Sequence, residues 1–369
     1  MILTNGADQH RLTRLLKAAE DGDPGVQTEL GLELFDRGRV AEAEEWLRRA
    51  VEGGARGAAL HLAELLAEEK RNDEADGMYR LAIERGGDAH LSYGNFLSDS
   101  LDAQEEAERQ YRLAISLGSF GAHRNLGILL RDAVRLEAAE EELRSAVAEG
   151  DVEARWPLAD LLAELGRTDE AEDEYRTLID SGESRAIADL GTFYRNRGRI
   201  KDAERAYRES LDHGDLYAYY LLGELLEEND RLPEAEKVYQ EGLDAGAEDV
   251  RLKYANLLSD QPARRAKAEH LYRESLEAGE IDAHNNLALL LEHVGRLDEA
   301  ELHYREAVSR GDLTAQRNFA AFLMDSERLD EAERHLREVI DARDDPEARR
   351  LLVDLLVRDG REDEAAELE

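Results

Sequence analysis

A short internal repeat constrains this chain more than any other feature. The triplet Glu42-Ala43-Glu44 recurs along the sequence, and its central alanine returns at Ala75, Ala107, Ala139, Ala171, Ala203, Ala235, Ala268, Ala300, Ala332 and Ala365. The period is constant to within one position along the whole series. Eleven copies therefore cover nearly all of the 369 residues. One array of similar units replaces the two or three globular domains that this length alone would suggest.

Each copy predicts two helices. In the first helix, leucines recur at helical spacing, as at Leu222, Leu225 and Leu226. A small residue follows the first leucine, where two helices can approach closely: Gly31, Ala63, Gly94, Gly127, Ala159, Gly191, Gly223, Ala255, Ala288 and Ala320. The second helix carries the repeat alanine and, four positions later, a large residue that is mostly Tyr. Because glycine adopts left-handed backbone easily, we expect glycines to end the first helices at Gly38, Gly166, Gly198, Gly295 and Gly360.

The short segments that connect one copy to the next, here called joints, carry a second recurring pattern. Gly-Asp pairs are expected to end one repeat and cap the next: Gly22-Asp23, Gly87-Asp88, Gly150-Asp151, Gly214-Asp215 and Gly311-Asp312.

These residues together resemble a known family. A Leu-Gly or Leu-Ala pair, an alanine twelve positions later, a Tyr four later and a small residue three later is similar to the tetratricopeptide repeat. The joint in residues 150–159 and the stretches 122–127 and 283–288 resemble the Sel1-like repeat. The resemblance implies an all-α fold, a right-handed α-solenoid superhelix of about eleven tandem 32–33-residue helix-turn-helix repeats. It implies little about function, because such families share an architecture and not a ligand.

Longer-range organisation is also expected. Residues 1–21 should form an N-terminal capping helix, followed by the repeat array 22–369. Eleven residues between 88 and 112, including Asn95 and Tyr111, reappear 161 positions later, which suggests a duplicated five-repeat block at about 54–213 and 214–369. The last second helix is cut short by the end of the chain. We expect that end to be frayed, truncated or engaged in self-association.

Composition narrows the classes of partner. The chain has 86 Asp and Glu against 48 Lys and Arg, a formal net charge of −38, which disfavours nucleic acid and anionic membranes. It has no Cys, no visible signal peptide and no apolar run long enough to span a bilayer, so a cytoplasmic protein is expected. Arg outnumbers Lys 42 to 6, which hints at a bacterial genome of high GC content.

No motif in the sequence predicts catalysis, a cofactor or a metal, so we do not expect an enzyme. The stretch Gly53-Gly54-Ala55-Arg56-Gly57 looks like a phosphate-binding loop, but no strand precedes it, and it is interpreted as a turn at a joint. The ten histidines are scattered. His293 and His303 are two neighbouring histidines in the C-terminal half, and for them a surface role is favoured over a metal site.

The resemblance implies that first helices line a concave groove, where residues three before, one after and four after the small residue face a partner. The candidates on this surface are Asn95, Arg124, Asn125, Arg131, Trp156, Arg195, Tyr220, Asn256, Asn285 and Arg317. Asparagine suits peptide binding because its amide both donates and accepts. The arginines could receive an acidic or C-terminal carboxylate, although the carboxylate-clamp pattern of the family is matched only in part.

Several alternatives stay open. For Asn125, together with Asn286 and Asn318, capping or hydrogen bonding at the joints is favoured over partner binding. Trp156 and Tyr220 could equally be partner anchors or packing residues. The function predicted is a non-enzymatic scaffold that binds a protein or peptide in the groove. The alternative is an inhibitor or immunity-type protein that uses its acidic second helices to neutralise a basic enzyme or nucleic-acid-binding protein.

Overall fold

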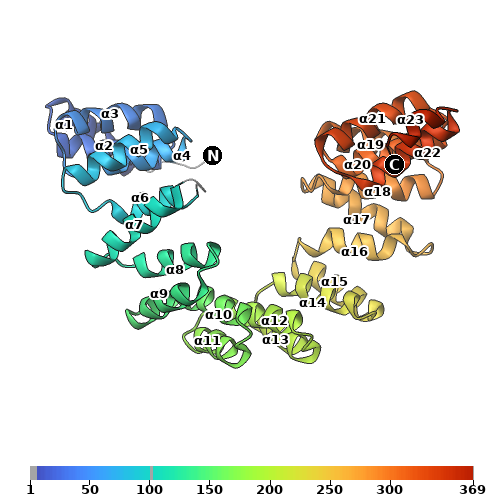
Figure 1. Ribbon diagram of the computed structural model, residues 1–369, viewed down its shortest axis with the longest axis horizontal. Coiled ribbons are helices and arrows are strands. Elements are labelled where there is room, and N and C mark those ends of the chain that lie inside the picture. Colours follow the sequence, from blue (N-terminus) through green and yellow to red (C-terminus); the bar gives the residue numbers. More distant parts are fainter. Residues whose placement is uncertain (1–5, 100–102, 369) are drawn as a thin grey trace. The chain divides into compact units, whose positions relative to one another are not determined.

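The computed structural model describes residues 6–99 and 103–368, and every regular element in these two ranges is a helix (Figure 1). The chain divides into two compact units, unit 1 from Met1 to Ser181 and unit 2 from Gly182 to Glu369. In unit 1 the helices are α1 Gly6–Glu20, α2 Pro24–Asp36, α3 Val40–Glu52, α4 Ala58–Glu68, α5 Asn72–Glu84, α6 His90–Ser98, α7 Gln104–Ser116, α8 Ala122–Asp132, α9 Leu136–Ala148, the short 3₁₀ helix η2 Val152–Ala154, α10 Arg155–Glu164 and α11 Thr168–Asp180.

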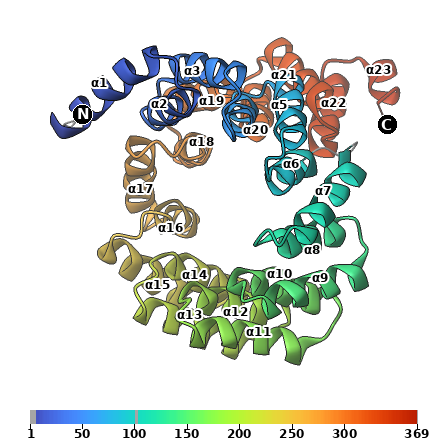
Figure 2. The same cartoon turned by 90° about the vertical axis from the view of Figure 1, so that its left-hand side faces the viewer.

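In unit 2 the helices are α12 Arg185–Asn196, α13 Ile200–Asp212, α14 Tyr217–Glu228, α15 Leu232–Ala245, α16 Val250–Ser259, α17 Arg265–Glu277, α18 Ala283–His293, α19 Leu297–Ser309, α20 Leu313–Asp325, α21 Leu329–Ala342, α22 Pro346–Arg358 and α23 Glu362–Ala366. Within each unit, the even-numbered helix of every pair packs against the odd-numbered helix that follows it. The pairs follow one another in sequence order (Figure 2). Helix α1 precedes the first pair and packs against α2, the position expected of a capping helix.

The small residue of the first helix lets the two helices of a pair come close. A Cβ atom built at Gly223 would lie 2.0 Å from the ring of Tyr239, and one at Gly127 would lie 2.6 Å from Leu143. Tyr239 and Leu143 are themselves fully buried, so neither side chain has room to retreat. The sequence-based prediction of close helix approach at these positions is confirmed, and it places the core between the two helices of each pair.

The turn inside each pair needs a residue in the left-handed region. The glycines expected there have positive φ, between 68° at Gly198 and 79° at Gly295. Four pairs place another residue at the same point: Lys70, Val134, Asp230 and Glu327, with φ of 57–59°. The repeat spacing, more than the glycine, therefore sets this conformation.

The joints agree with the Gly-Asp prediction only in part. Asp23 and Asp312 accept hydrogen bonds from backbone N–H groups of α2 and α20, as N-cap residues do. Asp151 was expected to cap in the same way and does not, because its Oδ1 accepts a 3.1 Å bond from Arg124 Nη1. At the joint that contains Gly87-Asp88, the residue with positive φ is Gly86 rather than Gly87.

Packing between pairs is uneven on the two sides. Successive first helices touch one another, as α14 does with α16 and α18 with α20, whereas successive second helices make little such contact in the described residues. The surface formed by the first helices is therefore the more continuous one. Among the described residues, no helix combines the length and apolar character needed to cross a bilayer.

Candidate partner-binding surface

The first helices carry all ten candidate residues, of which Asn285 is buried, and their contacts separate them into groups. Arg124 on α8 and Arg317 on α20 reach the joint that follows their own repeat. Arg124 pairs with Asp151 and Glu153, and Arg317 lies 3.3 Å from Asp345. Burial alone would raise the pKa of Asp345, but hydrogen bonds from Ala348 and Arg343, with the charge of Arg317, lower it. Both arginines thus already have carboxylate partners within the chain.

Arg131 and Arg195 occupy the position four residues after the small residue. Arg131 Nη1 lies 3.8 Å from Asp160 on α10, and Arg195 Nη1 lies 3.3 Å from Glu224 on α14. In each case the carboxylate belongs to the next first helix. An acidic ligand would have to compete with these internal pairs, so a ligand-binding role for the four arginines stays a prediction.

Asn256 lies in a surface hollow of about 390 Å³ between α16, α17 and α18. We call this hollow the asparagine pocket; its lining residues are Asn256, Ser259, Asp260, Arg265, Tyr272, Asn286, Leu289, Leu290 and His293. The Tyr272 hydroxyl donates a 2.8 Å hydrogen bond to Asn256 Oδ1. Burial raises the pKa of Tyr272 to about 12, so its hydroxyl keeps its proton and remains a donor at neutral pH.

A directed chain of amide hydrogen bonds leads to this pocket. Asn318 Nδ2 donates to Asn285 Oδ1 at 3.0 Å, and Asn285 Nδ2 donates to Asn286 Oδ1 at 3.2 Å. Asn286 Nδ2 then donates to Asn256 Oδ1 at 3.0 Å. The chain joins three successive first helices, α20, α18 and α16. Oδ1 of Asn256 accepts two hydrogen bonds. The N–H groups of the Asn256 amide are therefore the donors that remain for an outside acceptor. The bonds accepted by Oδ1 make these N–H groups stronger donors.

The same arrangement occurs in unit 1. Tyr111 donates to Asn95 Oδ1 at 3.0 Å, and Asn125 Nδ2 donates to the same oxygen at 2.7 Å. Asn95 and Asn125 therefore match Asn256 and Asn286 in contacts as well as in position. Part of the turn next to this site, residues 100–102, lies outside the described residues.

A comparison with known families decides what kind of repeat this is. A family model described as tetratricopeptide repeat matches residues 9–57, 124–186, 188–250, 263–316 and 323–369, well over half of the chain. The chain belongs to the tetratricopeptide-repeat family. No curated protein matches its sequence.

Comparison with solved structures finds a similar fold in yeast Tom70. The structure of yeast Tom70 is 15% identical in sequence, with 96% of this chain and 93% of that chain covered and a TM-score of 0.52. The human IFIT1 dimer with m7Gppp-AAAA is 15% identical and covers 100% of this chain and 94% of that chain, with a TM-score of 0.40. The predicted all-α solenoid of tandem repeats is confirmed.

The two aromatic candidates of this tetratricopeptide-repeat protein are half-buried. The Tyr220 hydroxyl donates to Glu224 Oε1 at 2.8 Å, and its ring stacks on Tyr217 with centroids 5.3 Å apart. Lys253 Nζ lies 5.2 Å above the Tyr220 ring. Tyr220 therefore packs within its own repeat and still shows part of its ring. Trp156 occupies the corresponding position on α10.

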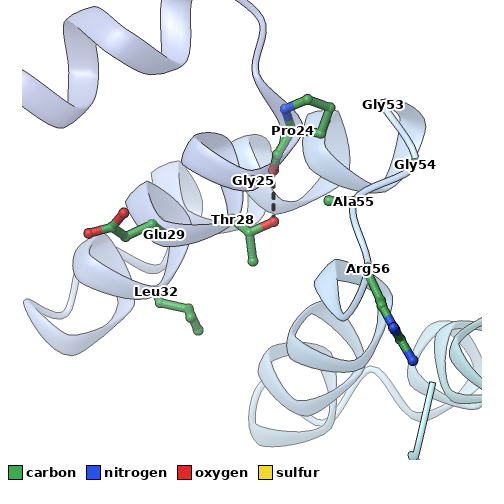
Figure 3. Close-up of a pocket in the computed structure, with 9 residues that line it drawn as sticks. All are labelled: Pro24, Gly25, Thr28, Glu29, Leu32, Gly53, Gly54, Ala55 and Arg56. Carbon is green, nitrogen blue, oxygen red and sulfur yellow. Dashed lines mark hydrogen bonds between the residues drawn. The ribbon is translucent and has the colours of Figure 1, made fainter.

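The glycine-rich stretch is a joint between α3 and α4, with helices on both sides (Figure 3). A Cβ at Gly53 would lie 2.6 Å from Pro24 Cγ, and Gly54 and Gly57 have positive φ. The adjacent hollow, of about 610 Å³, is lined by α2 and this joint. In Figure 3 the Thr28 hydroxyl donates to the Pro24 carbonyl at 2.9 Å, and Arg56 extends away from both. The glycines thus serve close packing and turning.

Histidines mark a contact that the sequence interpretation missed. In several helix pairs, the residue four positions before the small residue of the first helix contacts a residue of the second helix. That second residue lies three positions after the repeat alanine. Five polar pairs occur there: His90–Gln110, His123–Glu142, Arg155–Glu174, His284–His303 and Gln316–His335. The Nδ1 atoms of His284 and His303 are 2.9 Å apart. His303 therefore pairs with His284, a contact that the sequence interpretation did not anticipate. No group of three or more His, Asp or Glu side chains in the described ranges is placed to hold a metal.

The acidic residues of the second helices form many ion pairs with arginines. The glutamate after the repeat alanine accepts from the arginine four residues later and from the arginine that begins the next second helix. Glu140, for example, bonds Arg144 at 2.8 Å and Arg167 at 2.7 Å. Equivalent glutamates are Glu44, Glu204, Glu269, Glu301 and Glu333. These carboxylates join neighbouring repeats rather than forming an unpaired acidic face.

Proposed function

We propose that this protein is a non-enzymatic scaffold that binds an extended segment of a partner protein along its first helices. The observation that carries the proposal is the amide chain from Asn318 to Asn256, which ends with donors at a surface hollow. An extended peptide exposes carbonyl oxygens at regular intervals and accepts such donors. Membership of the tetratricopeptide-repeat family supports the same class of partner.

The charge of the molecule favours a partner with basic residues elsewhere in the bound segment. At −38, the chain attracts cationic segments over long range, which raises the association rate and makes it fall with ionic strength. Measuring association by stopped flow between about 20 and 500 mM NaCl tests this part of the proposal. An association rate that does not change with salt would remove the electrostatic contribution.

The peptide-binding role is tested with a random dodecapeptide display library selected on the full chain. Peptides that bind are then measured by fluorescence anisotropy against Asn256→Asp. This variant keeps an oxygen that accepts from Tyr272 and Asn286 but loses the amide donors. We expect the dissociation constant to rise about tenfold or more, the effect of losing one to two hydrogen bonds.

The matched control is Asn72→Ala, because Asn72 is exposed at the start of the second helix α5. It should bind the peptides like the unaltered chain. Failure to enrich any peptide, or equal loss of binding in both variants, contradicts the proposed site. Far-UV circular dichroism of each variant separates loss of binding from loss of fold.

A further inference from the structure

The set of residues that lines the asparagine pocket in unit 2 recurs in unit 1 with different charges, and we call the recurring set the unit 1 pocket. Each residue that lines the unit 2 pocket has a counterpart 161 positions earlier in unit 1. Six counterparts are identical: Asn95, Ser98, Asp99, Tyr111, Asn125 and Leu129. Three differ: Arg265 is replaced by Gln104, His293 by Asp132 and Leu289 by Ile128.

The identical residues make identical contacts. In both units a tyrosine hydroxyl and an asparagine amide donate to the central asparagine oxygen. In both, a serine hydroxyl donates to the backbone carbonyl of that asparagine, Ser98 to Asn95 at 2.7 Å and Ser259 to Asn256 at 2.8 Å. The framework that presents the asparagine amide is therefore the same, which leaves the two charged substitutions as the main difference.

These substitutions change the charges at the edge of the pocket. In unit 2, Arg265 balances Asp260, and Arg265 is anchored by a 3.3 Å bond from its Nε to the Ser259 carbonyl. The exposed His293 adds a ring nitrogen that can donate a hydrogen bond. In unit 1, Gln104 is neutral, while Asp99 and Asp132 are both exposed carboxylates. Arg131 Nη2 lies 3.7 Å from Asp132 and offsets part of that charge.

We propose that the two pockets select different ligand side chains. The unit 2 pocket takes a segment with an acidic side chain or a terminal carboxylate, which Asn256, Arg265 and His293 can bind together. The unit 1 pocket takes a segment with Lys or Arg, which Asp99 and Asp132 attract while Asn95 donates to the main chain. This inference rests on the proposed peptide-binding function and adds the specificity of each pocket.

The experiment uses the full chain with one pocket disabled at a time. A random dodecapeptide display library is selected on Asn95→Ala, which leaves the unit 2 pocket intact, and on Asn256→Ala, which leaves the unit 1 pocket intact. Alanine removes the amide without adding a carboxylate that would itself attract Lys or Arg. We expect Asp and Glu to be enriched in the first selection and Lys and Arg in the second. Equal charge composition in the two selections would overturn the inference.

Reciprocal exchanges give the second readout. The double variant Arg265→Gln, His293→Asp should weaken the acidic peptides at least tenfold, and the double variant Gln104→Arg, Asp132→His should weaken the basic ones similarly. These four positions are polar or exposed, and circular dichroism confirms that the exchanges keep the fold. If peptides bind but the exchanges do not change their affinity, the proposed difference in selectivity is wrong, while the proposed peptide binding stands. If neither selection yields a peptide, the proposed function itself fails.

Discussion

At the scale of single residues, Val134 adopts a conformation that suits it poorly. Its φ is 58°, in the left-handed region, where a β-branched residue is strained. Its side chain is 76% exposed, so it gains little from packing. The repeat spacing requires a residue with positive φ in this turn, so Val134 adopts that conformation at a cost in free energy. Other pairs place glycine at the same point, as at Gly166 and Gly198.

Val134→Gly is therefore expected to stabilise the protein by about 1 kcal/mol, because glycine adopts this conformation without strain. Urea unfolding followed by circular dichroism measures the change. The matched control is Gly166→Ala, where φ is 73° and a Cβ would meet no neighbour, so any loss of stability reports backbone strain alone. A Val134→Gly chain that is no more stable than the original contradicts the prediction.

A second residue-scale prediction concerns pH. Burial lowers the pKa of His284, His303 and His335, and the fold thus favours their neutral forms. The unfolded chain therefore binds protons at a higher pH than the folded chain. The stability they contribute is complete above the ordinary histidine pKa of about 6.5 and is lost as pH falls below it. Unfolding free energy should drop between about pH 7.5 and about pH 5.5.

His303→Gln should reduce that drop, since glutamine reproduces the His–Gln pairing that His90 and Gln110 show at 2.7 Å. The control is His270→Gln, which removes a histidine whose side chain is 72% exposed. Carboxylates whose pKa is lowered by arginine, such as Glu140, lose their contribution only below about pH 4.5, outside this window. Equal profiles for all three chains would be inconsistent with the histidine explanation.

At the scale of helices, the arginine–glutamate links tie each second helix to the next repeat. Glu204 on α13 pairs with Arg208 on its own helix at 2.5 Å and with Arg231 of the next pair at 2.7 Å. Only 11% of the Glu204 side chain is exposed, so solvent screens these bonds weakly. Hydrogen bonds from Arg231 and Arg208 lower the pKa of Glu204 in spite of burial.

Glu204→Gln should destabilise the protein by about 1–2 kcal/mol, because two arginines lose a shared, charge-assisted acceptor. Urea unfolding at about pH 7 measures this change. Glu209→Gln is the control, since Glu209 is exposed on the same helix. As pH falls below about 4.5 and the Glu204 carboxylate takes up a proton, the difference between the two variants should shrink. A difference that is unchanged in acid would show that charge is not its cause.

The helix pairs were predictable from sequence in a way that their polar contacts were not. The spacing between Gly223 and Tyr239 recurs in most copies, so periodicity alone predicted their packing. Arg195 and Glu224 belong to different repeats, and their meeting depends on how one pair stacks on the next. The candidate arginines were found in sequence, but their internal partners were not. The His284–His303 pair had a usable signal, because polar residues recur at the same two positions in five copies.

At the scale of the whole chain, a repeat protein gains its stability from each repeat and from nearest-neighbour interfaces. Unit 1 and unit 2 each contain a continuous series of such interfaces. The asparagine pocket of unit 2 and the matching residues 161 positions earlier in unit 1 support our proposal that a five-repeat block, at about 54–213 and 214–369, was duplicated.

We therefore expect residues 182–369, produced alone, to fold into a helical unit. All residues of the asparagine pocket and its amide chain, from Asn256 to Asn318, lie inside this range. Circular dichroism should show high helix content and a cooperative urea transition. The isolated unit should also bind the peptides selected on the Asn95→Ala chain. Residues 188–316, which omit most of α20 and all of α21–α23, serve as the comparison and should be less stable, because fewer interfaces remain. An unfolded 182–369 fragment would show instead that the stability of unit 2 depends on the rest of the chain.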